Sequence, residues 1–135
     1  MGSRRASRET AMQILYAIDV CKLTKEEAEE AFWQTKKYDK DVVSFARELI
    51  DGAIANTEEL DGILKETAEN WEIGRMAGVD RAILRLAAYE LVYTLGTPAN
   101  AVINEAIELA KDFSTEESGK FVNGILDKVK KLKRK

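Results

Sequence analysis

Histidine is absent from this chain of 135 residues. Its absence removes the side chain that most often acts as a general base and as a zinc ligand. Cys21 is the single cysteine, so no disulfide can form within the chain, and we expect Cys21 to be a small, half-buried apolar residue. We therefore predict no metal site and no cofactor. One proline and eight glycines leave long helices with few interruptions.

Long apolar runs and catalytic signatures are also missing. No run approaches the roughly 20 apolar residues that cross a bilayer, and the N-terminus lacks the apolar core of a signal peptide, so we expect a cytoplasmic protein. No glycine-rich phosphate loop, nucleophile elbow or zinc-binding helix signature is present. The acidic pairs Glu58-Glu59 and Glu116-Glu117 are interpreted as charges at helix starts. We therefore predict that the protein is not an enzyme.

The charges that are present are unevenly distributed. Residues 1–9 hold three arginines and one glutamate, residues 128–135 hold six basic residues and no acid, and residues 10–127 hold 12 basic and 23 acidic residues. An acidic body with basic ends is typical of a protein that binds nucleic acid locally and a basic protein elsewhere. The basic tail at 128–135, which we expect to be mobile, is equally consistent with a role in solubility alone.

Apolar residues recur at helical spacing along the chain, whereas strand alternation is scarce. The pattern predicts a first helix at about 5–20 and a nearly all-apolar helix at about 79–95, which should be the buried central one. Arg85 and Glu90 lie within that central helix, and we expect polar partners for both, because a buried charge is costly unless it is paired. We predict an all-α fold of one domain, residues 1–135: a compact bundle of about seven helices in two subdomains, divided at Gly74 to Gly78.

Capping residues mark three further helix starts. The two pairs with the spacing of a capping box are Thr24 with Glu27 and Ser114 with Glu117. Either Asn56 or Thr57 is expected to cap the fourth helix.

Residues 98–128 are the most informative part of the sequence for function. They have the pattern of two amphipathic helices on either side of a short acidic, serine-rich turn. Basic, aromatic and amide side chains cluster around that turn: Lys111, Phe113, Lys120, Phe121 and Asn123. Exposed rings beside Lys and Asn suit single-stranded RNA, whose bases stack on aromatic side chains and whose phosphates attract cations. For Phe121, a place in the core beside Val122 is the alternative.

The N-terminal segment SRRASRETAMQILY adds a second basic element. Arg4, Arg5 and Arg8 lie within two helical turns, and Arg4 and Arg8, four residues apart, should share one face that continues toward Gln13 and Tyr16. Arginine forks match phosphate oxygens and stack on bases. A small helical RNA-binding protein is therefore the function that the residues favour.

The chain resembles the NusB family of bacterial transcription antitermination factors along essentially its whole length. The segments with this resemblance are SRRASRETAMQILYAID, VDRAILRLAAYEL, INEAIELAKDF and ESGKFVNGILDK. The resemblance implies an all-helical protein with two subdomains that is not an enzyme. It also implies binding to the boxA element of ribosomal-RNA leader transcripts together with NusE, a ribosomal small-subunit protein, in an antitermination complex with RNA polymerase.

The resemblance further implies roles for individual residues. RNA contacts are implied for Arg4, Arg5, Arg8, Tyr16, Lys111, Phe113, Glu117, Ser118, Lys120 and Phe121. Asp80, at the start of the central helix, corresponds to the acidic residue implicated in NusE binding. Two features depart from the family pattern: Ala6 and Ser7 interrupt the arginine run, and Ala99-Asn100 stand where an aromatic–basic pair is familiar.

Two other functions remain open at this point. The chain could be a self-associating helical protein without an RNA role. The resemblance allows this, since some proteins of the NusB family form homodimers that cover the RNA face. It could also be an accessory RNA-binding module of an rRNA methyltransferase system, because a NusB-like domain resembles the leading domain of some rRNA cytosine methyltransferases.

Overall fold

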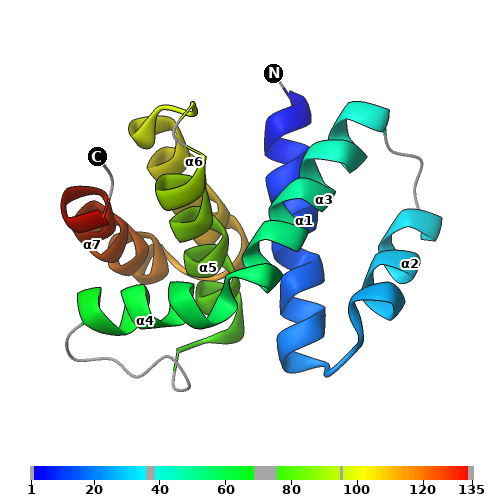
Figure 1. The fold of residues 1–135 in the computed structure, drawn as a ribbon, viewed down its shortest axis with the longest axis horizontal. Helices are drawn as coiled ribbons and strands as arrows, with labels where there is room; N and C mark the ends of the chain where they lie inside the picture. The colour runs from blue at the N-terminus through cyan, green and yellow to red at the C-terminus, as the bar shows by residue number, and fades with distance from the viewer. Residues whose placement is uncertain (1, 36–38, 69–75, 95, 134–135) are drawn as a thin grey trace.

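The computed structural model describes residues 2–35, 39–68, 76–94 and 96–133. Within these residues the chain forms seven α-helices and no strand (Figure 1), which confirms the predicted all-α class. The helices are α1 Gly2–Val20, α2 Lys25–Thr35, α3 Lys40–Ala55, α4 Thr57–Thr67, α5 Gly78–Tyr93, α6 Ala99–Phe113 and α7 Glu116–Lys133. None of the helices in these ranges is long and apolar enough to cross a membrane.

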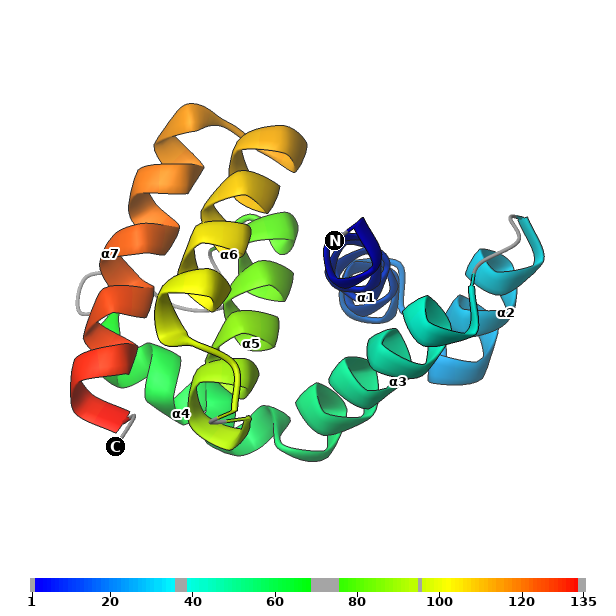
Figure 2. The ribbon, with the colours of Figure 1, turned by 90° about the horizontal axis from the view of Figure 1, so that it is seen from above.

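The helices form two groups on either side of α1. Figure 2 shows α1 between α3 and α5, with α2 at the outer edge, while α4 to α7 form the second group and α6 pairs with α7. The predicted boundary at Gly74 to Gly78 is wrong, because α4 packs against α5 and α7. The two groups divide instead at Asn56, between α3 and α4. One continuous apolar core includes residues of both groups.

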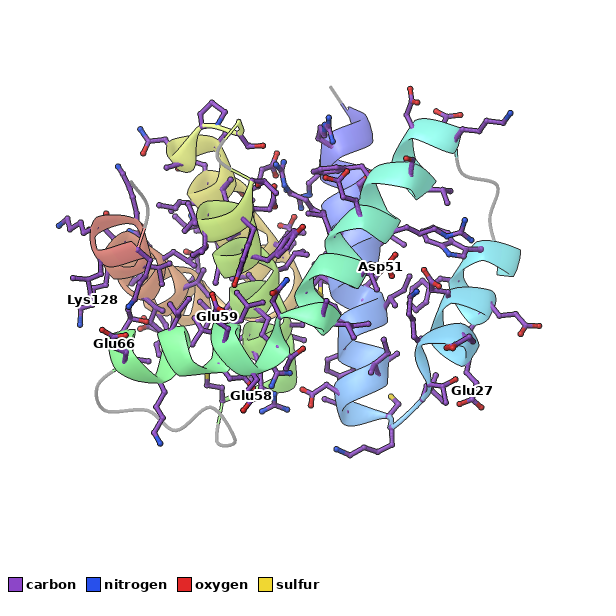
Figure 3. All side chains as sticks on the ribbon, viewed as in Figure 1. Glu27, Asp51, Glu58, Glu59, Glu66 and Lys128 are labelled. Carbon is purple, nitrogen blue, oxygen red and sulfur yellow. The ribbon has the colours of Figure 1, made fainter. Side chains whose placement is uncertain are left out.

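Helix α5 is the buried central helix, as predicted. It packs against α1, α3, α4, α6 and α7, and side chains fill the space between it and its neighbours (Figure 3). Its two charged residues have partners: Arg85 donates hydrogen bonds of 2.8 Å to both carboxylate oxygens of Asp61, and Glu90 accepts two from Arg8. The expectation that Arg85 and Glu90 have structural roles is therefore confirmed.

Ion pairs join α1 to α5 and α6 along its length. Near its start, the Arg5 guanidinium lies 3.4 Å from a carboxylate oxygen of Glu105 and also pairs with Asp112, both on α6. Near its end, Asp19 accepts a 2.6 Å hydrogen bond from Nε of Arg81 on α5. These contacts fix how α1, and the side chains that it presents, lie relative to the second group.

The predicted caps are partly correct. Thr24 and Glu27 form a reciprocal capping box, with N–H to side-chain distances of 2.9 and 3.0 Å, and Glu27 projects from the outer surface of α2 (Figure 3). Asn56 and Thr57 do not cap α4, because their side chains donate hydrogen bonds to carbonyl oxygens at the end of α3. The acidic pair Glu58-Glu59 is exposed at the start of α4 (Figure 3).

The start of α7 also differs from the prediction. The residue that caps it is Thr115, whose hydroxyl oxygen accepts a 3.0 Å hydrogen bond from the N–H of Ser118. Ser114 instead shares a hydroxyl–hydroxyl hydrogen bond of 2.8 Å with Ser118. Ser114 and Thr115 are both residue types that commonly cap helices, and Thr115 is the one that caps α7.

Helices α3 and α5 approach each other closely at Gly52. The ring of Tyr89 occupies the space where any larger residue would place its side chain: an added Cβ at Gly52 would lie 2.1 Å from Cζ of Tyr89. Tyr89 in turn stacks on Tyr93, with ring centroids 5.5 Å apart. A larger residue at position 52 would therefore require the Tyr89 ring to move.

Candidate nucleic-acid interface

The first turns of α5 and α7 meet through a hydrogen bond between Asp80 and Ser118. The Ser118 hydroxyl donates to Oδ2 of Asp80 over 3.1 Å, and both residues are buried. The capping geometry at Thr115 fixes the position of Ser118. The two helix starts, 38 residues apart in the sequence, are thus held in one place.

Beside this hydrogen bond is a hollow of about 630 Å³, which we call the α5–α7 hollow. It is lined by Met76, Ala77, Asp80, Glu117, Ser118, Lys120 and Phe121. Five of these residues were singled out from the sequence, in two separate segments. The fold therefore brings the residue assigned to a protein partner and several residues assigned to RNA onto one surface.

Asp80 lines the hollow, and one of its carboxylate oxygens is buried without a hydrogen-bond partner among the described residues. This oxygen is Oδ1, and the residue as a whole is 7% exposed. Burial raises the pKa of Asp80, against the effect of the nearby Ser118 and Ser114 hydroxyl groups, which lower it. A buried acceptor without a partner is costly. Because this oxygen is inaccessible in the free protein, a donor on a bound molecule would reach it only after the side chains around it move.

The outer edge of the hollow combines charge with an aromatic ring. Glu117 and Lys120 are highly exposed and lie 3.7 Å apart, one helical turn from each other. Such an exposed pair is weak, so the Lys120 ammonium is available to a phosphate. Phe121 is half-buried and packs against the core, as its alternative interpretation predicted, and its role toward RNA stays a prediction. Asn123 is exposed further along α7.

Lys111 and Phe113 extend this surface along α6. Phe113 is an exposed large apolar side chain at the end of the helix. The stem of Lys111 lies across the buried Gly119 of α7: a Cβ at position 119 would be 3.1 Å from Cγ of Lys111. The lack of a side chain at Gly119 therefore sets where the Lys111 ammonium can reach.

Tyr16 and Gln13 lie half-buried on α1. The Tyr16 ring packs beside the first residue of α5, where a Cβ on Gly78 would be 3.0 Å from Cε1 of Tyr16. Tyr16 is not among the described residues that line the hollow, although Gly78 directly follows Met76 and Ala77 in the sequence.

The three N-terminal arginines are in different environments, which the sequence did not indicate. Arg8 is 6% exposed, and both of its hydrogen-bonding nitrogens bind Glu90, so its predicted place on an RNA-facing surface is corrected: it lies inside the molecule. Arg5 is partly exposed but already pairs with Glu105 and Asp112. Arg4 is exposed, and no carboxylate pairs with it in the described part of the chain. Arg4 and Arg8 do share a face, as predicted, since both lie over the ring of Phe45.

Sequence reasoning missed Met76, Ala77 and Phe45. Met76 and Ala77 fall in the predicted break before α5 and have no chemical signature of their own. Phe45 could have been noticed, because it lies one position before Ala46 of the buried stripe of α3 and is the aromatic residue at the edge of that stripe.

No metal-binding cluster supplements this surface. In the ranges that the structure describes, no three Cys, Asp or Glu side chains are placed to hold a metal ion, and Cys21 is exposed rather than half-buried. The chemistry of the surface is that of hydrogen bonding, stacking and charge.

Comparison with known proteins assigns the fold to a family. The model of the NusB family matches residues 5–131. The chain is 44% identical over 133 residues to the transcription antitermination protein NusB of Myxococcus xanthus, covering 96% of this chain and 95% of that protein. It is 46% identical over 136 residues to the NusB of Elusimicrobium minutum, covering 99% and 97%.

Solved structures agree with this assignment. A structure of the antitermination factors NusB and NusE in complex with dsRNA matches with a TM-score of 0.89 and 31% identity, over 97% of this chain and 98% of that one. A NusB structure from T. maritima matches with a TM-score of 0.88 and 38% identity, over 98% and 93%. The chain belongs to the NusB family.

Proposed function

We propose that the protein is a transcription antitermination factor that binds boxA RNA of ribosomal-RNA leader transcripts together with NusE. In this role it helps RNA polymerase to avoid premature termination. The observation that supports this most directly is the α5–α7 hollow, which brings Asp80, the exposed Lys120 and the half-buried Phe121 together on one surface. The protein acts by binding and not by catalysis.

The chemistry of the hollow favours two adjoining partners. Lys120, Lys111 and the ring of Phe113 offer cations and a stacking surface to single-stranded RNA. Asp80 offers a carboxylate oxygen to a cationic donor, which suits a basic ribosomal protein such as NusE. Because Ser118 hydrogen-bonds to Asp80 and adjoins Glu117, RNA and NusE would touch neighbouring residues.

The experiment is fluorescence anisotropy with a labelled boxA-containing RNA and a scrambled RNA, with NusE present and absent. We expect selective binding of boxA RNA that NusE strengthens. Equal, weak binding of both RNAs would contradict the proposal.

A matched pair of variants tests the surface. Lys120→Ala and Lys128→Ala remove the same charge from exposed positions of α7, and Figure 3 labels Lys128. We expect Lys120→Ala to weaken boxA binding and Lys128→Ala to leave it nearly unchanged. An equal loss in both variants would indicate a general charge effect and would remove Lys120 from the interface.

Self-association remains the alternative. Light scattering with and without boxA RNA separates the two functions, because a dimer that covers the RNA surface should dissociate when RNA binds. A dimer that persists, together with no RNA binding, would favour a structural role.

A further inference from the structure

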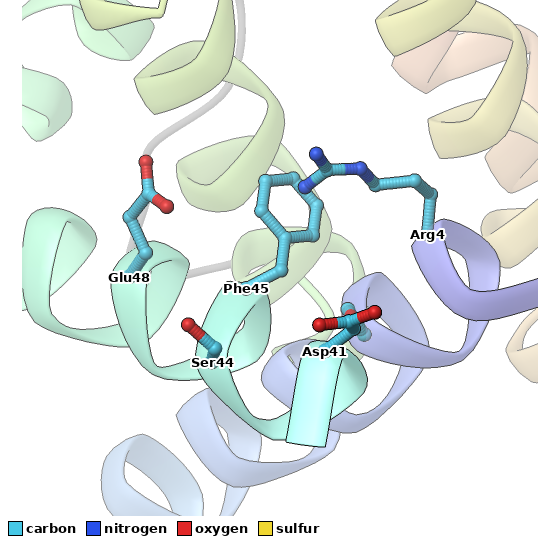
Figure 4. A pocket seen from close by; sticks show the side chains of 6 residues that line it. Arg4, Asp41, Ser44, Phe45 and Glu48 are labelled. Carbon is cyan, nitrogen blue, oxygen red and sulfur yellow. The ribbon is translucent and has the colours of Figure 1, made fainter. Parts of the chain in front are cut away.

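A second hollow lies on the other side of α1, between its N-terminal turns and α3. Four residues of α3, Asp41, Ser44, Phe45 and Glu48, recur at spacings of three and four and so share one face of the helix. With Arg4 and Ser7 of α1 they line a space of about 280 Å³ (Figure 4), slightly below the roughly 300–1,000 Å³ typical of small-ligand pockets. We call it the α1–α3 hollow.

Arg4 and Phe45 form a stacked platform in this hollow. The Arg4 guanidinium carbon lies 3.8 Å from the centroid of the Phe45 ring, and Figure 4 shows the side chain extended over that ring. Arg4 is exposed, so the ring orders one side of the guanidinium and solvent reaches the other. A planar guanidinium held in this way is a stacking surface for a nucleobase.

The charges around the platform restrict what can bind. Asp41 and Glu48 are exposed on either side of Phe45 along α3, and in the described residues neither is engaged in an ion pair. A phosphate would be repelled by these two carboxylates, and a simple cation would be repelled by Arg4. A neutral planar group with N–H donors on its edge avoids both penalties, because it can stack on Arg4 and donate to a carboxylate.

Nucleobases with an exocyclic amino group have this chemistry. Glu and Asp accept hydrogen bonds from the N4 amino group of cytosine. Uracil has no amino group, and its single N3–H donor lies between two carbonyl oxygens that a carboxylate would repel. The Ser7 hydroxyl, which also lines the hollow, donates to the carbonyl of Val42 over 2.8 Å and so ties α1 to α3. The two walls of the hollow are therefore held at a fixed separation.

We propose that the α1–α3 hollow is a subsite for a single unstacked RNA base that bears an exocyclic amino group. The base stacks on Arg4, which Phe45 supports, and its amino group donates to Asp41 or Glu48. The inference rests on the proposed RNA-binding function and extends the RNA path. Arg5 pairs with Asp112 of α6, while the neighbouring Arg4 lies over the Phe45 ring of α3. The N-terminus of α1 therefore joins the surface of α6 and α7 to this hollow.

The test compares two fluorescent single-stranded RNAs of equal length, oligocytidine and oligouridine, on the whole protein and on the variants Asp41→Asn and Glu48→Gln. We expect at least one variant to lose about fivefold or more of its affinity for oligocytidine, with the affinity for oligouridine unchanged or slightly raised. Electrostatics alone predicts the opposite sign, because removing a carboxylate strengthens binding of any polyanion. A rise for both RNAs would therefore overturn the proposal.

Further variants separate stacking from charge. Arg4→Lys keeps the charge and Phe45→Leu keeps an apolar side chain, but each removes one plane of the platform, and both should reduce the preference for oligocytidine. Glu58→Gln, an exposed carboxylate on α4, is the control and should not change that preference. If Lys120→Ala weakens binding while none of the α1–α3 variants alters the preference, the RNA-binding function stands and the subsite is excluded. No binding of either RNA, or of boxA RNA, by the unaltered protein would overturn both.

Discussion

Arg8 of α1 donates two hydrogen bonds of 2.9 Å, from Nε and Nη2, to the two carboxylate oxygens of Glu90 in α5. Both residues are nearly inaccessible: Arg8 is 6% exposed and Glu90 is 1% exposed. The bidentate geometry satisfies both charges in a place where water cannot reach them. The pair therefore joins the two helix groups across α1.

The first prediction concerns the stability that depends on this pair. Arg8→Ala leaves the Glu90 carboxylate buried without a partner and should reduce the free energy of unfolding by about 3–5 kcal/mol. Urea denaturation followed by circular dichroism measures the loss. The double variant Arg8→Met with Glu90→Met removes both charges and should recover most of it. A small effect of Arg8→Ala alone would show that Glu90 finds another partner.

The second prediction separates Arg4 from Arg5 in RNA binding. Arg4 is exposed without a carboxylate partner in the described residues, whereas Arg5 pairs with Glu105 and Asp112. Arg4→Ala should weaken RNA binding without measurable loss of stability, and Arg5→Ala should lower stability as well as affinity. If Arg4 stacks on a base, Arg4→Ala should leave the salt dependence of RNA binding nearly unchanged. If Arg4 contacts a phosphate, the variant should flatten the slope of log affinity against log salt concentration by about 0.7. Affinities from 50 to 300 mM salt distinguish the two roles.

The third prediction uses two glycines with opposite surroundings. Alanine normally stabilises a helix interior by about 1 kcal/mol relative to glycine. Gly62 of α4 has open space around it, so Gly62→Ala should raise stability by about that amount. At Gly52 the new methyl group would collide with the Tyr89 ring, and Gly52→Ala should lower stability by about 1–3 kcal/mol. Thermal melts of the two variants should therefore shift in opposite directions, and a stabilising Gly52→Ala would mean that Tyr89 moves aside easily.

The fourth prediction concerns pH. The pKa of Asp80 is raised by burial in the folded state, so the folded protein binds the proton more tightly than the unfolded chain does. Proton binding by Asp80 therefore adds to the free energy of unfolding. This contribution is fully present below the pKa of Asp80 in the unfolded chain, near 3.9, and it is lost as the pH rises through the higher pKa of the folded protein. Asp80→Asn removes the buried charge and should raise the melting temperature at pH 7 but not at pH 3. The same variant should weaken NusE binding, because the amide is a poorer partner for a cation. An equal shift at both pH values would indicate an effect unrelated to ionisation.

Much of the fold could be predicted because its signals are local. Val42, Ala46, Leu49, Ile50 and Ala53 recur at the spacing of one helix face, and all five are buried in α3. The reciprocal cap of Thr24 and Glu27 likewise follows from four consecutive residues. The partners of buried charges could be expected to exist but not to be identified. Glu90 required a cation, yet nothing near it in the sequence indicated Arg8, which is 82 residues away.

The same distance explains the error over the N-terminal arginines. All three looked alike as phosphate-binding residues, because the sequence does not show which sides of α1 face α5 and α6. Ser118 and Asp80 could be given separate roles from the family resemblance, but only the packing of α7 on α5 shows that they share a hydrogen bond. Phe45 was overlooked for a similar reason, since its contact with Arg4 joins helices that are far apart in the chain.

The position of α1 between α3 and α5 has a consequence for how the chain folds during synthesis. The contacts of α1 with α2 and α3 become available early, but Arg8 has no counter-charge until residue 90 has been made, and Arg5 waits for residues 105 and 112. Until then the α5-facing side of α1 is an apolar surface interrupted by an unpaired guanidinium. Contacts of such sequence separation slow folding, and completion of the native packing must await emergence of the C-terminal helices from the ribosome.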